Sequence, residues 1–397
     1  MVILPRVILK RGKEKPVLRG HPWVFSGAVA KVEGEVSPGE LGEVYSKEGQ
    51  FLGLGHINPR SQIVVRLLTQ KKEELGENFF KERISRAMDL REDWSRKKTN
   101  AYRVINGEGD YLPGLIADRY GETLVLQCLT AGMDRLKGML THLLVKEFRP
   151  QSIPHSIYER SDVATRREEG LAENRGLLFG KDVPEFVEME EYGCRFRVNV
   201  KKGQKTGFYL DQRENRFFLK ELSEGKKILD CFSYTGAFSV HAGSGGAKEV
   251  TLVDSSEEAL AMAEEHFSLN QLEKVPHRFI RGDVFESIRG LEPGYDIVIL
   301  DPPPFAKKRG HLPSASRGYK DLSLWAFRLL NKEGLLFTFS CSHHMSWDLF
   351  QKIVFSAALD SGKSVQLIRR MGHPWDHPIN LCHPEGEYLK GLICKVL

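Results

Sequence analysis

The stretch KILDCFSYTGAFSVHAGSGGAKEVTLVD, residues 227–254, decides the fold. It reads as an apolar strand, a short turn, a helix and a second apolar strand, and the same alternation continues to about residue 360. Strands that alternate with amphipathic helices predict a doubly wound, mostly parallel sheet, whose ligand site lies at the carboxyl ends of the strands. The expected strands are 227–232, 249–254, 278–281, 296–301 and 335–341, and the expected helices are 237–243, 256–270, 321–331 and 346–360.

The chain before this sheet has a different pattern. Up to about residue 70, short apolar runs alternate with Gly, Pro and Ser turns, which favours a small β-barrel. An amphipathic helix is expected at 78–94, and strands and helices mix from about 101 to 197. Within that part, the highly charged run 160–175 lacks clear periodicity, so we expect an exposed loop and helix without chemistry of its own.

Composition excludes several classes of protein. The 397 residues are 41% hydrophobic with ordinary Gly and Pro contents, so the chain is neither collagen-like nor disordered. No run approaches 18 apolar residues, and the N-terminus is charged too soon for a signal peptide. The six cysteines form no C-x-x-C pair, which argues against a disulfide framework or a zinc site. We therefore expect a soluble protein in a reducing cytoplasm.

Charge is distributed unevenly along the chain. The net charge is +5, and residues 1–70 contain ten Lys and Arg against six Glu and no Asp. A locally basic small domain favours an anionic partner, most often nucleic acid. A solvated charged surface is the alternative that charge alone leaves open.

Acidic residues follow the first strands of the expected sheet. Asp254 closes the strand 249–254 and could accept hydrogen bonds from both ribose hydroxyls of a nucleoside. Asp283 follows the third strand and could accept from an adenine amino group. Each could instead be a helix N-cap, but three acidic strand ends in order, Asp230, Asp254 and Asp283, favour a nucleoside cofactor. The turn 233–236 lacks the G-x-G-x-x-G pattern, which disfavours NAD.

Two further strand ends carry candidate chemistry. Asp301 leaves a fully apolar strand into the loop Pro302-Pro303-Pro304-Phe305, and a charged residue at a buried strand end requires a partner. Cys341 leaves the fifth strand between two serines, and we interpret it as a nucleophile rather than a small core residue. The histidines that follow it have no third metal ligand at suitable spacing, so no metal is expected.

With these residues in place, the chain closely resembles the bacterial family of S-adenosylmethionine-dependent 23S ribosomal RNA 5-methylcytosine methyltransferases with an N-terminal PUA domain. The matching stretches cover essentially the whole chain in family order. They are HPWVF (21–25), GDYLPGLIADRY (109–120), KTGFYLDQR (205–213), CFSYTG (231–236), DPP (301–303), RGYKD (317–321), FSCS (339–342) and PEGEYLKG (384–391).

The resemblance implies an α/β protein with three domains. These are a PUA RNA-binding β-barrel at 1–70, a small central α+β domain at 71–190 and a Rossmann-like class I methyltransferase domain at 191–397. It also implies S-adenosylmethionine as cofactor, Cys341 as nucleophile and Asp301 beside the methyl-transfer pocket. The implied cofactor-binding residues are Thr206, Phe208, Phe232, Tyr234, Thr235, Gly236, Asp254, Asp283 and Asp301.

The expected chemistry is attack of a Cys341 thiolate on C6 of a cytosine that has left its stack. Pro303, Phe305 or Tyr319 could pack against the base, and Arg317 and Lys320 could supply the cationic neighbourhood that a thiolate requires.

The sequence departs from the family at two points and leaves alternatives open. Position 304 is Pro where family members often have Lys, and there is no second cysteine in the fourth-strand motif, so the group that removes the C5 proton is unidentified. A base-amino methyltransferase (adenine N6 or guanine N2) and a non-catalytic RNA-binding assembly factor are the alternatives. The target nucleotide, the choice between naked RNA and an assembled subunit, and the oligomeric state are not legible from the sequence.

Overall fold

A computed structural model describes residues 4–95, 99–306 and 308–397. The chain divides into two compact units. The first contains the chain up to Glu190, together with Arg197–Leu210 and Trp375–Gly386. The second contains Glu191–Phe196, Asp211–Pro374 and Glu387–Leu397. Neither unit is therefore continuous in sequence, and the chain passes between them several times.

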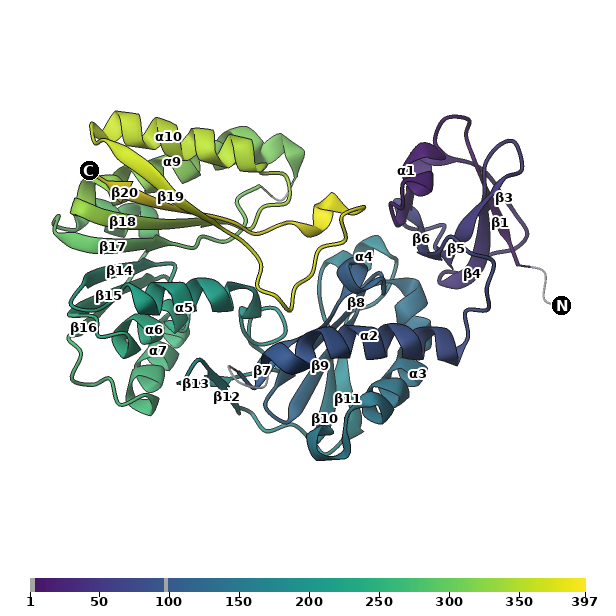
Figure 1. The fold of residues 1–397 in the computed structure, drawn as a ribbon, viewed down its shortest axis with the longest axis horizontal. Helices are drawn as coiled ribbons and strands as arrows, with labels where there is room; N and C mark the ends of the chain where they lie inside the picture. The colour runs from purple at the N-terminus through teal and green to yellow at the C-terminus, as the bar shows by residue number, and fades with distance from the viewer. Residues whose placement is uncertain (1–3, 96–98, 307) are drawn as a thin grey trace. The chain divides into compact units, whose positions relative to one another are not determined.

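A six-stranded sheet begins the first unit, in the order β2-β6-β5-β4-β1-β3 (Figure 1). Its strands are β1 (Arg6–Leu9), β2 (Trp23–Phe25), β3 (Val29–Glu33), β4 (Glu40–Tyr45), β5 (Phe51–Ile57) and β6 (Ile63–Thr69), with the short helix α1 at Lys15–Leu18. The apolar runs of the sequence form five of these strands, and Val7, Val44 and Val65 are buried in their core. The sequence did not predict β3, because this edge strand is almost wholly exposed and has no apolar side to reveal it.

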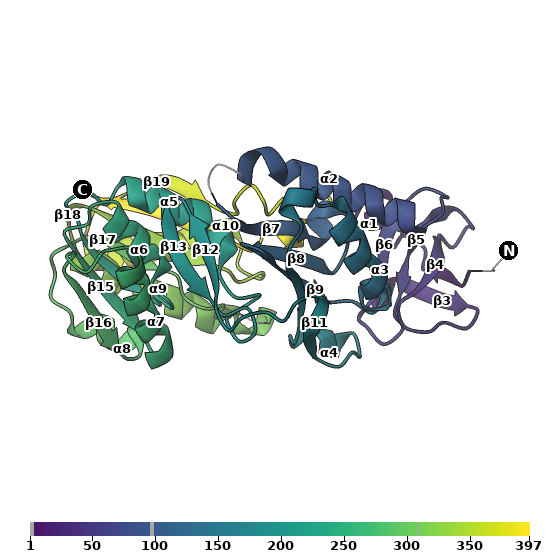
Figure 2. The ribbon, with the colours of Figure 1, turned by 90° about the horizontal axis from the view of Figure 1, so that it is seen from below.

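A five-stranded sheet, in the order β11-β10-β9-β8-β7, forms the rest of the first unit, with α2 and α3 packed on it (Figures 1 and 2). Its elements are α2 (Glu77–Ser95), β7 (Ala101–Asn106), β8 (Leu115–Tyr120), β9 (Thr123–Cys128), α3 (Ala131–Glu147), β10 (Ser156–Ser161), α4 (Thr165–Glu168) and β11 (Asn174–Gly180). The helix expected at 78–94 is confirmed as α2. The hydroxyl of Thr130 caps α3 by accepting the backbone N–H of Met133, which explains where that helix begins.

The charged run 160–175 contains a short helix, α4, and is exposed over much of its length as expected, but three of its charged residues are not exposed. Arg160, Arg166 and Glu169 are buried, and each is paired. Glu169 accepts hydrogen bonds from Ser61 Oγ (2.7 Å) and Arg66 Nη2 (2.9 Å), both on the six-stranded sheet side of this unit. The prediction was wrong for these three residues because most of their partners come from distant parts of the chain, as Val200 does for Arg160 and Asp134 for Arg166. A buried charge is stable when it is paired and hydrogen-bonded.

A seven-stranded sheet forms the second unit, in the order β16-β15-β14-β17-β18-β20-β19. The strands β14 to β18 are parallel, and β20 runs antiparallel between β18 and β19. The helices α5, α6 and α7 lie on one side of the sheet and α9 and α10 on the other (Figure 1). The strands are β14 (Lys227–Cys231), β15 (Glu249–Asp254), β16 (His277–Arg281), β17 (Tyr295–Leu300), β18 (Leu330–Ser340), β19 (Val365–Met371) and β20 (Lys390–Val396). The helices are α5 (Arg213–Glu221), α6 (Ala237–Ser244), α7 (Glu257–Leu269), α8 (Val284–Ser287), α9 (Leu312–Leu329) and α10 (Trp347–Ser361).

The expected strand–helix alternation is confirmed, with two differences. The helix expected at 321–331 begins at Leu312, where Pro313 occupies a first-turn position that suits proline. The strands β19 and β20 were not predicted, because β19 is an exposed edge strand and β20 pairs antiparallel outside the repeating pattern. A two-stranded sheet of β12 (Val187–Glu191) and β13 (Cys194–Val198) lies where the chain first passes from one unit to the other.

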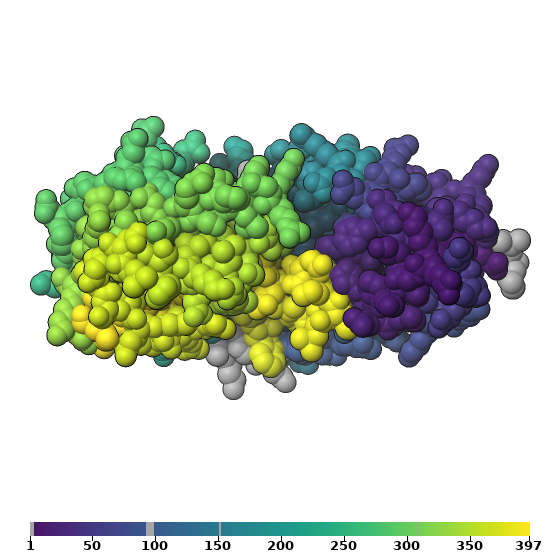
Figure 3. Space-filling model, turned by 90° about the horizontal axis from the view of Figure 1, so that it is seen from above, coloured from purple at the N-terminus to yellow at the C-terminus, as the bar shows by residue number. Residues whose placement is uncertain are grey.

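A late segment of the chain, Trp375–Gly386, completes the first unit. Asp376 Oδ2 accepts the backbone N–H of Arg103 (2.8 Å), and the Pro378 carbonyl accepts from Asn106 Nδ2 (2.9 Å). His383 packs against the ring of Trp23, with ring centroids 4.4 Å apart. In Figure 3 yellow atoms of the late chain lie against the purple atoms of the first strands.

Candidate functional site

The turn after β14 is strained and tightly held. Phe232 and Tyr234 have φ of 62° and 48°, and Gly236 has φ of 72°. The left-handed region is costly for residues other than Gly, and such strain concentrates at functional sites. A Cβ on Gly236 would lie 2.8 Å from the Cβ of Ala263, so this position requires glycine where the turn enters α6. The expected cofactor loop is thus an unusual backbone shape at the carboxyl edge of the sheet.

Asp254, the last residue of β15, supports this turn. Its Oδ2 accepts the backbone N–H of Tyr234 (2.8 Å), and its Oδ1 accepts the N–H of Ser256 (2.9 Å). These two bonds fix the carboxylate beside the β14 turn. A carboxylate has about four lone-pair sites, so each oxygen can also accept a ligand hydroxyl.

Asp283 caps α8, which is the alternative role that the sequence left open. Its Oδ1 accepts the N–H groups of Phe285 (2.7 Å) and Glu286 (3.3 Å). The residue is exposed. The capping role does not preclude a ligand contact through the second oxygen, so the adenine contact stays a prediction.

Two buried hydroxyls in the turn make no hydrogen bond to the described residues. They are Ser233 Oγ and Thr235 Oγ1. A buried hydroxyl without a partner costs free energy, so these oxygens suit a bound polar molecule. Thr235 was expected from the sequence and Ser233 was not.

Three carboxylates interact electrostatically beside this turn. The pKa of Asp230 is raised to about 7, mainly by burial. A hydrogen bond from Ser239 opposes this shift, and the negative charges of Asp301 and Asp254 add to it. The expected site residues Asp254 and Asp301 thus have a buried third carboxyl nearby, Asp230, which ends the first strand and was not among the expected cofactor-binding residues. Such a group of carboxyls favours a ligand that carries positive charge.

Cys341 follows the last residue of β18 and is half-buried. Its Sγ lies 3.8 Å from the Pro302 carbonyl, so the fifth strand and the Asp301-Pro302-Pro303 loop meet as the sequence predicted. The hydroxyls of Ser340 and Ser342 lie 3.0 Å and 3.4 Å from Tyr319 Oη. The thiol therefore sits between two serines that α9 holds in place through one phenol.

A cation that the sequence did not suggest interacts with Cys341, and the two that it did suggest have other surroundings. Lys320 Nζ pairs with Asp360 at 2.7 Å, and Arg317 is exposed on α9. Lys390, buried at the start of β20, donates to the Ser342 carbonyl at 3.1 Å and interacts electrostatically with Cys341. The stretch PEGEYLKG contains this lysine, but its nearness to the thiol depends on an antiparallel strand that the sequence pattern did not show.

The expected base-packing residues differ in exposure. Pro303 is exposed and Phe305 is half-buried, whereas Tyr319 is buried. The Phe305 ring lies 4.8 Å from that of Tyr319 and 6.5 Å from that of Phe232. The structure thus brings these aromatic side chains together at the carboxyl edge, with Pro303 and Phe305 the ones open to solvent.

Thr206 and Phe208 belong to the first unit. The Thr206 hydroxyl donates to Asp118 Oδ2 (2.6 Å) and lies 2.8 Å from Tyr120 Oη. Phe208 is buried, and its backbone N–H donates to Tyr120 Oη (3.2 Å). The Thr206 side chain and the Phe208 backbone are therefore held by β8, and the expected cofactor contacts of both residues stay a prediction.

The basic character of the first residues is concentrated in one exposed stretch. Lys10, Arg11, Lys13, Lys15 and Arg19 are all exposed around α1. Exposed cations on adjoining surface positions suit phosphate contacts.

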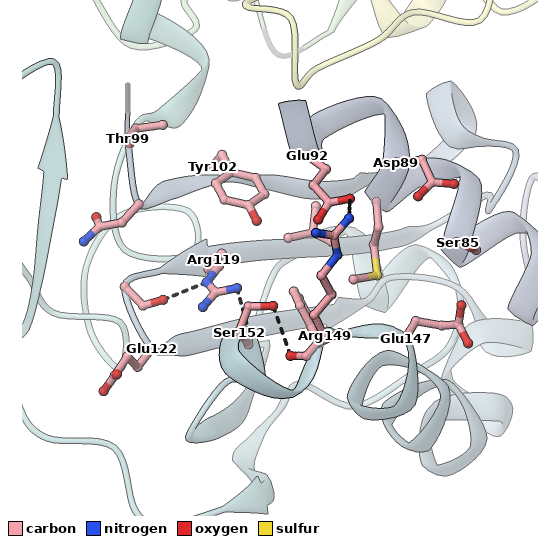
Figure 4. A pocket seen from close by; sticks show the side chains of 15 residues that line it. Ser85, Asp89, Glu92, Thr99, Tyr102, Arg119, Glu122, Glu147, Arg149 and Ser152 are labelled. Carbon is pink, nitrogen blue, oxygen red and sulfur yellow. Dashed lines mark hydrogen bonds and ion pairs between the residues drawn. The ribbon is translucent and has the colours of Figure 1, made fainter. Parts of the chain in front are cut away.

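A pocket of about 450 Å³ lies in the first unit, lined by α2, β7, β8 and the end of α3 (Figure 4). Arg119 donates from Nη1 to the Ser152 carbonyl (3.0 Å), and Arg149 pairs with Glu92 (2.7 Å). None of the residues expected from the sequence lines it. With Asp89, Glu122 and Glu147 also in its wall, carboxylates outnumber arginines, which disfavours RNA phosphates there.

No group of three or more His, Cys, Asp or Glu side chains in the described part of the chain could hold a metal ion. Among the helices that the structure describes, none is long and apolar enough to cross a membrane.

Comparison with known proteins identifies the family of this chain. A family model described as a PUA-like domain matches residues 7–70, and one described as an S-adenosylmethionine-dependent methyltransferase matches residues 175–375. The chain is 44% identical to the ribosomal RNA large subunit methyltransferase I of Salmonella paratyphi C, over 99% of this chain and 98% of that protein. The chain belongs to this methyltransferase family. The protein of the same name from Cronobacter sakazakii is 43% identical over 99% of each chain.

Solved structures agree with the family. A putative methyltransferase from Streptococcus mutans is 26% identical, with a TM-score of 0.84 over the full length of both chains. A putative methyltransferase named SMU.776, complexed with SAH, has a TM-score of 0.85 at 26% identity. The expected PUA-like domain, Rossmann-like methyltransferase fold and S-adenosylmethionine cofactor are therefore confirmed. The residues at the carboxyl edge fit this cofactor, because a nucleoside with sulfonium and ammonium charges matches the carboxyls Asp230, Asp254 and Asp301 and the two unpartnered hydroxyls.

Proposed function

We propose that this methyltransferase modifies 23S ribosomal RNA at C5 of a cytosine, through a covalent bond between Cys341 and C6 of the base. The observation that carries the proposal is the position of Cys341, half-buried at the carboxyl edge with its Sγ 3.8 Å from the Pro302 carbonyl. A methyltransferase that acts on an exocyclic amino group needs no thiol at this point. The relatives that share the whole chain are named ribosomal RNA large subunit methyltransferases, which supports the RNA substrate.

The chemistry begins at the thiol. Cytosine C5 is a weak nucleophile, and addition of the Cys341 thiolate to C6 breaks the aromatic system and makes C5 enamine-like. When bound, the cofactor supplies the methyl group that C5 takes up. Loss of the C5 proton to a base then re-forms the C5–C6 double bond, and the electron pair of the C6–S bond returns to Cys341 as thiolate. Asp301 lines the pocket in which the reacting atoms meet.

The cofactor would be held by the β14 turn and the strand ends beside it. We propose that Asp254 binds the ribose hydroxyls, Asp283 the adenine, and the turn residues the remainder of the molecule. The turn residues are Phe232, Tyr234, Thr235 and Gly236. Thr206 and Phe208 are proposed as further cofactor contacts from the first unit.

The RNA would be held at two levels. We propose that Pro303 and Phe305 pack on the flipped base, with Tyr319 behind them, and that Arg317 and Lys320 bind nearby phosphates. The exposed cations of the PUA domain, residues 1–70, would anchor the rest of the RNA. The proposed central domain is 71–190, and the proposed methyltransferase domain is 191–397. Ribosomal RNA is modified where ribosomes are made, which keeps the cytoplasm as the proposed location.

A covalent trap tests the proposal. Transcribed 23S RNA that contains 5-fluorocytidine should give an adduct that survives denaturation, because fluorine at C5 cannot leave as the proton does. The adduct should be absent with the Cys341→Ala variant and with ordinary RNA. Mass mapping of nucleosides from treated RNA should find 5-methylcytidine.

The same experiment separates the alternatives. The Asp301-Pro302-Pro303-Pro304-Phe305 segment also suits an adenine N6 or guanine N2 methyltransferase. That enzyme would give an N-methylated nucleoside, no adduct, and an active Cys341→Ala variant. An assembly factor without catalysis would give neither product nor adduct, and either result would overturn the proposal.

A further inference from the structure

Lys390 is buried at the end of the sheet where Cys341 leaves it. The residue is 3% exposed, and in the β18–β20 ladder it is paired with Ser340, the neighbour of Cys341. Its Nζ donates to the carbonyl of Ser342 at 3.1 Å and to that of Tyr388 at 2.9 Å. The Tyr388 hydroxyl in turn donates to Asp211 Oδ2 at 2.8 Å, which fixes the segment that carries the lysine. The ammonium is thus held at the residue directly after the thiol.

A buried ammonium needs a negative partner. Carbonyl dipoles satisfy part of its hydrogen-bonding capacity, but burial without a counter-charge is costly. Two groups that can carry negative charge act on Lys390, and they are Glu387 and Cys341. Glu387 is exposed and accepts a hydrogen bond from Trp347 Nε1 (2.9 Å), so solvent screens its charge. The Cys341 side chain is the less exposed of the two.

We propose that Lys390 is a positioning residue that holds Cys341 as a thiolate, so that the nucleophile is charged before the RNA arrives. The inference rests on the proposed function for its catalytic meaning, but the charge state of the thiol can be measured without RNA. The proton that leaves the thiol goes to solvent, and no other bond changes.

The surrounding charges agree with this assignment. Burial lowers the pKa of Lys390 to about 8, against the opposing effects of Glu387 and Cys341, so the side chain remains mostly cationic at pH 7. From α9, Tyr319 faces the thiol with a pKa that burial raises, so this phenol stays neutral. From the segment after β18, His343 lies 5.6 Å from the Tyr388 ring. Asp301 follows β17 and precedes Pro302, whose carbonyl lies 3.8 Å from the thiol, and the effect of a carboxylate on a thiolate is opposite to that of the lysine.

Alkylation tests the proposal directly. The full-length protein with Cys382→Ser, which removes the other exposed thiol, is treated with iodoacetamide over a range of pH, and modification of Cys341 is followed by peptide mass spectrometry. In this background the apparent pKa of Cys341 should fall below the value of about 8.5 for a free cysteine. Lys390→Met should raise it by about one unit, so that the whole alkylation profile moves up by about one pH unit.

Two further variants keep the test specific. Lys390→Arg retains the charge and should keep alkylation at pH 7 within about threefold of the background rate. Lys395→Met removes the same charge from the far end of β20, where Lys395 pairs with Glu333 (2.6 Å), and should leave the pH profile unchanged.

A Lys390→Met profile that coincides with the background profile would overturn the proposal, provided that the variant still binds the cofactor. If that variant does not fold, a background thiol pKa at or above 8.5 would overturn it alone. Failure of the fluorocytidine trap with a normal Lys390 effect would instead remove the cytosine-C5 reaction and leave this inference standing.

Discussion

Cys231 ends β14 and Cys341 follows the last residue of β18, so the two thiols leave the same edge of one parallel sheet. Cys231 is fully buried, and burial raises the pKa of its thiol well above the ordinary value. The charge of the neighbouring Asp230 raises that pKa further. Cys341 is half-buried, and the cation Lys390 interacts with it electrostatically. The two positions look alike in sequence and differ in solvent access and in the sign of the neighbouring charge.

The difference extends to the two parts of the edge. Carboxyls surround the β14 turn, at Asp230, Asp254 and Asp301, whereas an ammonium lies beside the end of β18. The first environment suits a cationic cofactor and keeps a thiol protonated. The second suits a thiolate. One edge can therefore hold a positively charged methyl donor and an anionic nucleophile, because their stabilising groups lie on different strands.

The largest effect should come from exchanging the two cysteines for alanine separately. Cys341→Ala should lower the methylation rate at least about 10³-fold, or about 4 kcal/mol of transition-state stabilisation. Cys231→Ala should keep the rate within about threefold and lower the free energy of unfolding by about 1 kcal/mol, the cost of a small cavity. Initial rates and urea denaturation check both. Equal losses of activity in the two variants would show that strand position rather than environment matters.

The next effect should separate cofactor binding from chemistry. Asp254→Ala should weaken binding of S-adenosylmethionine by roughly 1.5–3 kcal/mol, or about 10–150-fold, because hydrogen bonds to a charged group are lost. Titration calorimetry checks the affinity, with Cys341→Ala as the variant that should bind normally. An Asp254→Ala protein with unchanged affinity would remove the ribose assignment.

A smaller effect should appear in RNA binding. Replacing Lys13, Lys15 and Arg19 with Gln should weaken RNA binding about tenfold at low salt and reduce the slope of log K against log salt by about 2, at ~0.7 per lost single-strand phosphate contact. Cofactor affinity should not change. The substitutions are preferable to deletion of residues 1–70, because deletion would remove Ser61 and Arg66 from the buried Glu169.

A matched triple variant controls this result. Lys226, Lys248 and Lys274 are exposed at the amino ends of β14, β15 and β16. Their replacement by Gln removes the same charge from the edge of the seven-stranded sheet that is opposite to the candidate cofactor site. Equal salt slopes for the two triple variants would mean that net charge, rather than the α1 stretch, binds the RNA.

The smallest effect should be the release of protons when the cofactor binds. With a pKa of about 7, the Asp230 carboxyl is about half-protonated at pH 7. A cationic cofactor bound nearby favours the carboxylate and lowers that pKa, so binding should release about half a proton at pH 7 and progressively fewer above pH 8, where the free carboxyl is already ionised. Calorimetry in buffers of different ionisation enthalpy measures the number. Asp230→Asn should abolish the buffer dependence, and its absence in the wild type would contradict the linkage.

The sequence predicted those features that depend on neighbours in the chain. Apolar runs and turn residues located the strands β14 to β18, and strand ends located Asp254, Asp283, Asp301 and Cys341. The failures share a physical cause. The buried charges Arg160, Arg166 and Glu169 depend on partners far away in the chain, and Lys390 reaches the thiol only through the antiparallel β20. Charge composition cannot reveal such pairings, because the same residues would be exposed if their partners were absent.

The segment Trp375–Gly386 gives the molecule a fixed order of assembly during translation. The first unit has received most of its residues once Leu210 is made, but the hydrogen bonds from the Arg103 backbone N–H and from Asn106 Nδ2 to the late segment form only after Asp376 and Pro378 emerge. At 5–20 residues per second, the ribosome needs on the order of 10 s to make the intervening chain. Throughout that interval the nascent first unit lacks the segment Trp375–Gly386, which packs against it in the folded protein. That segment is made only after nearly all of the second unit has been synthesised.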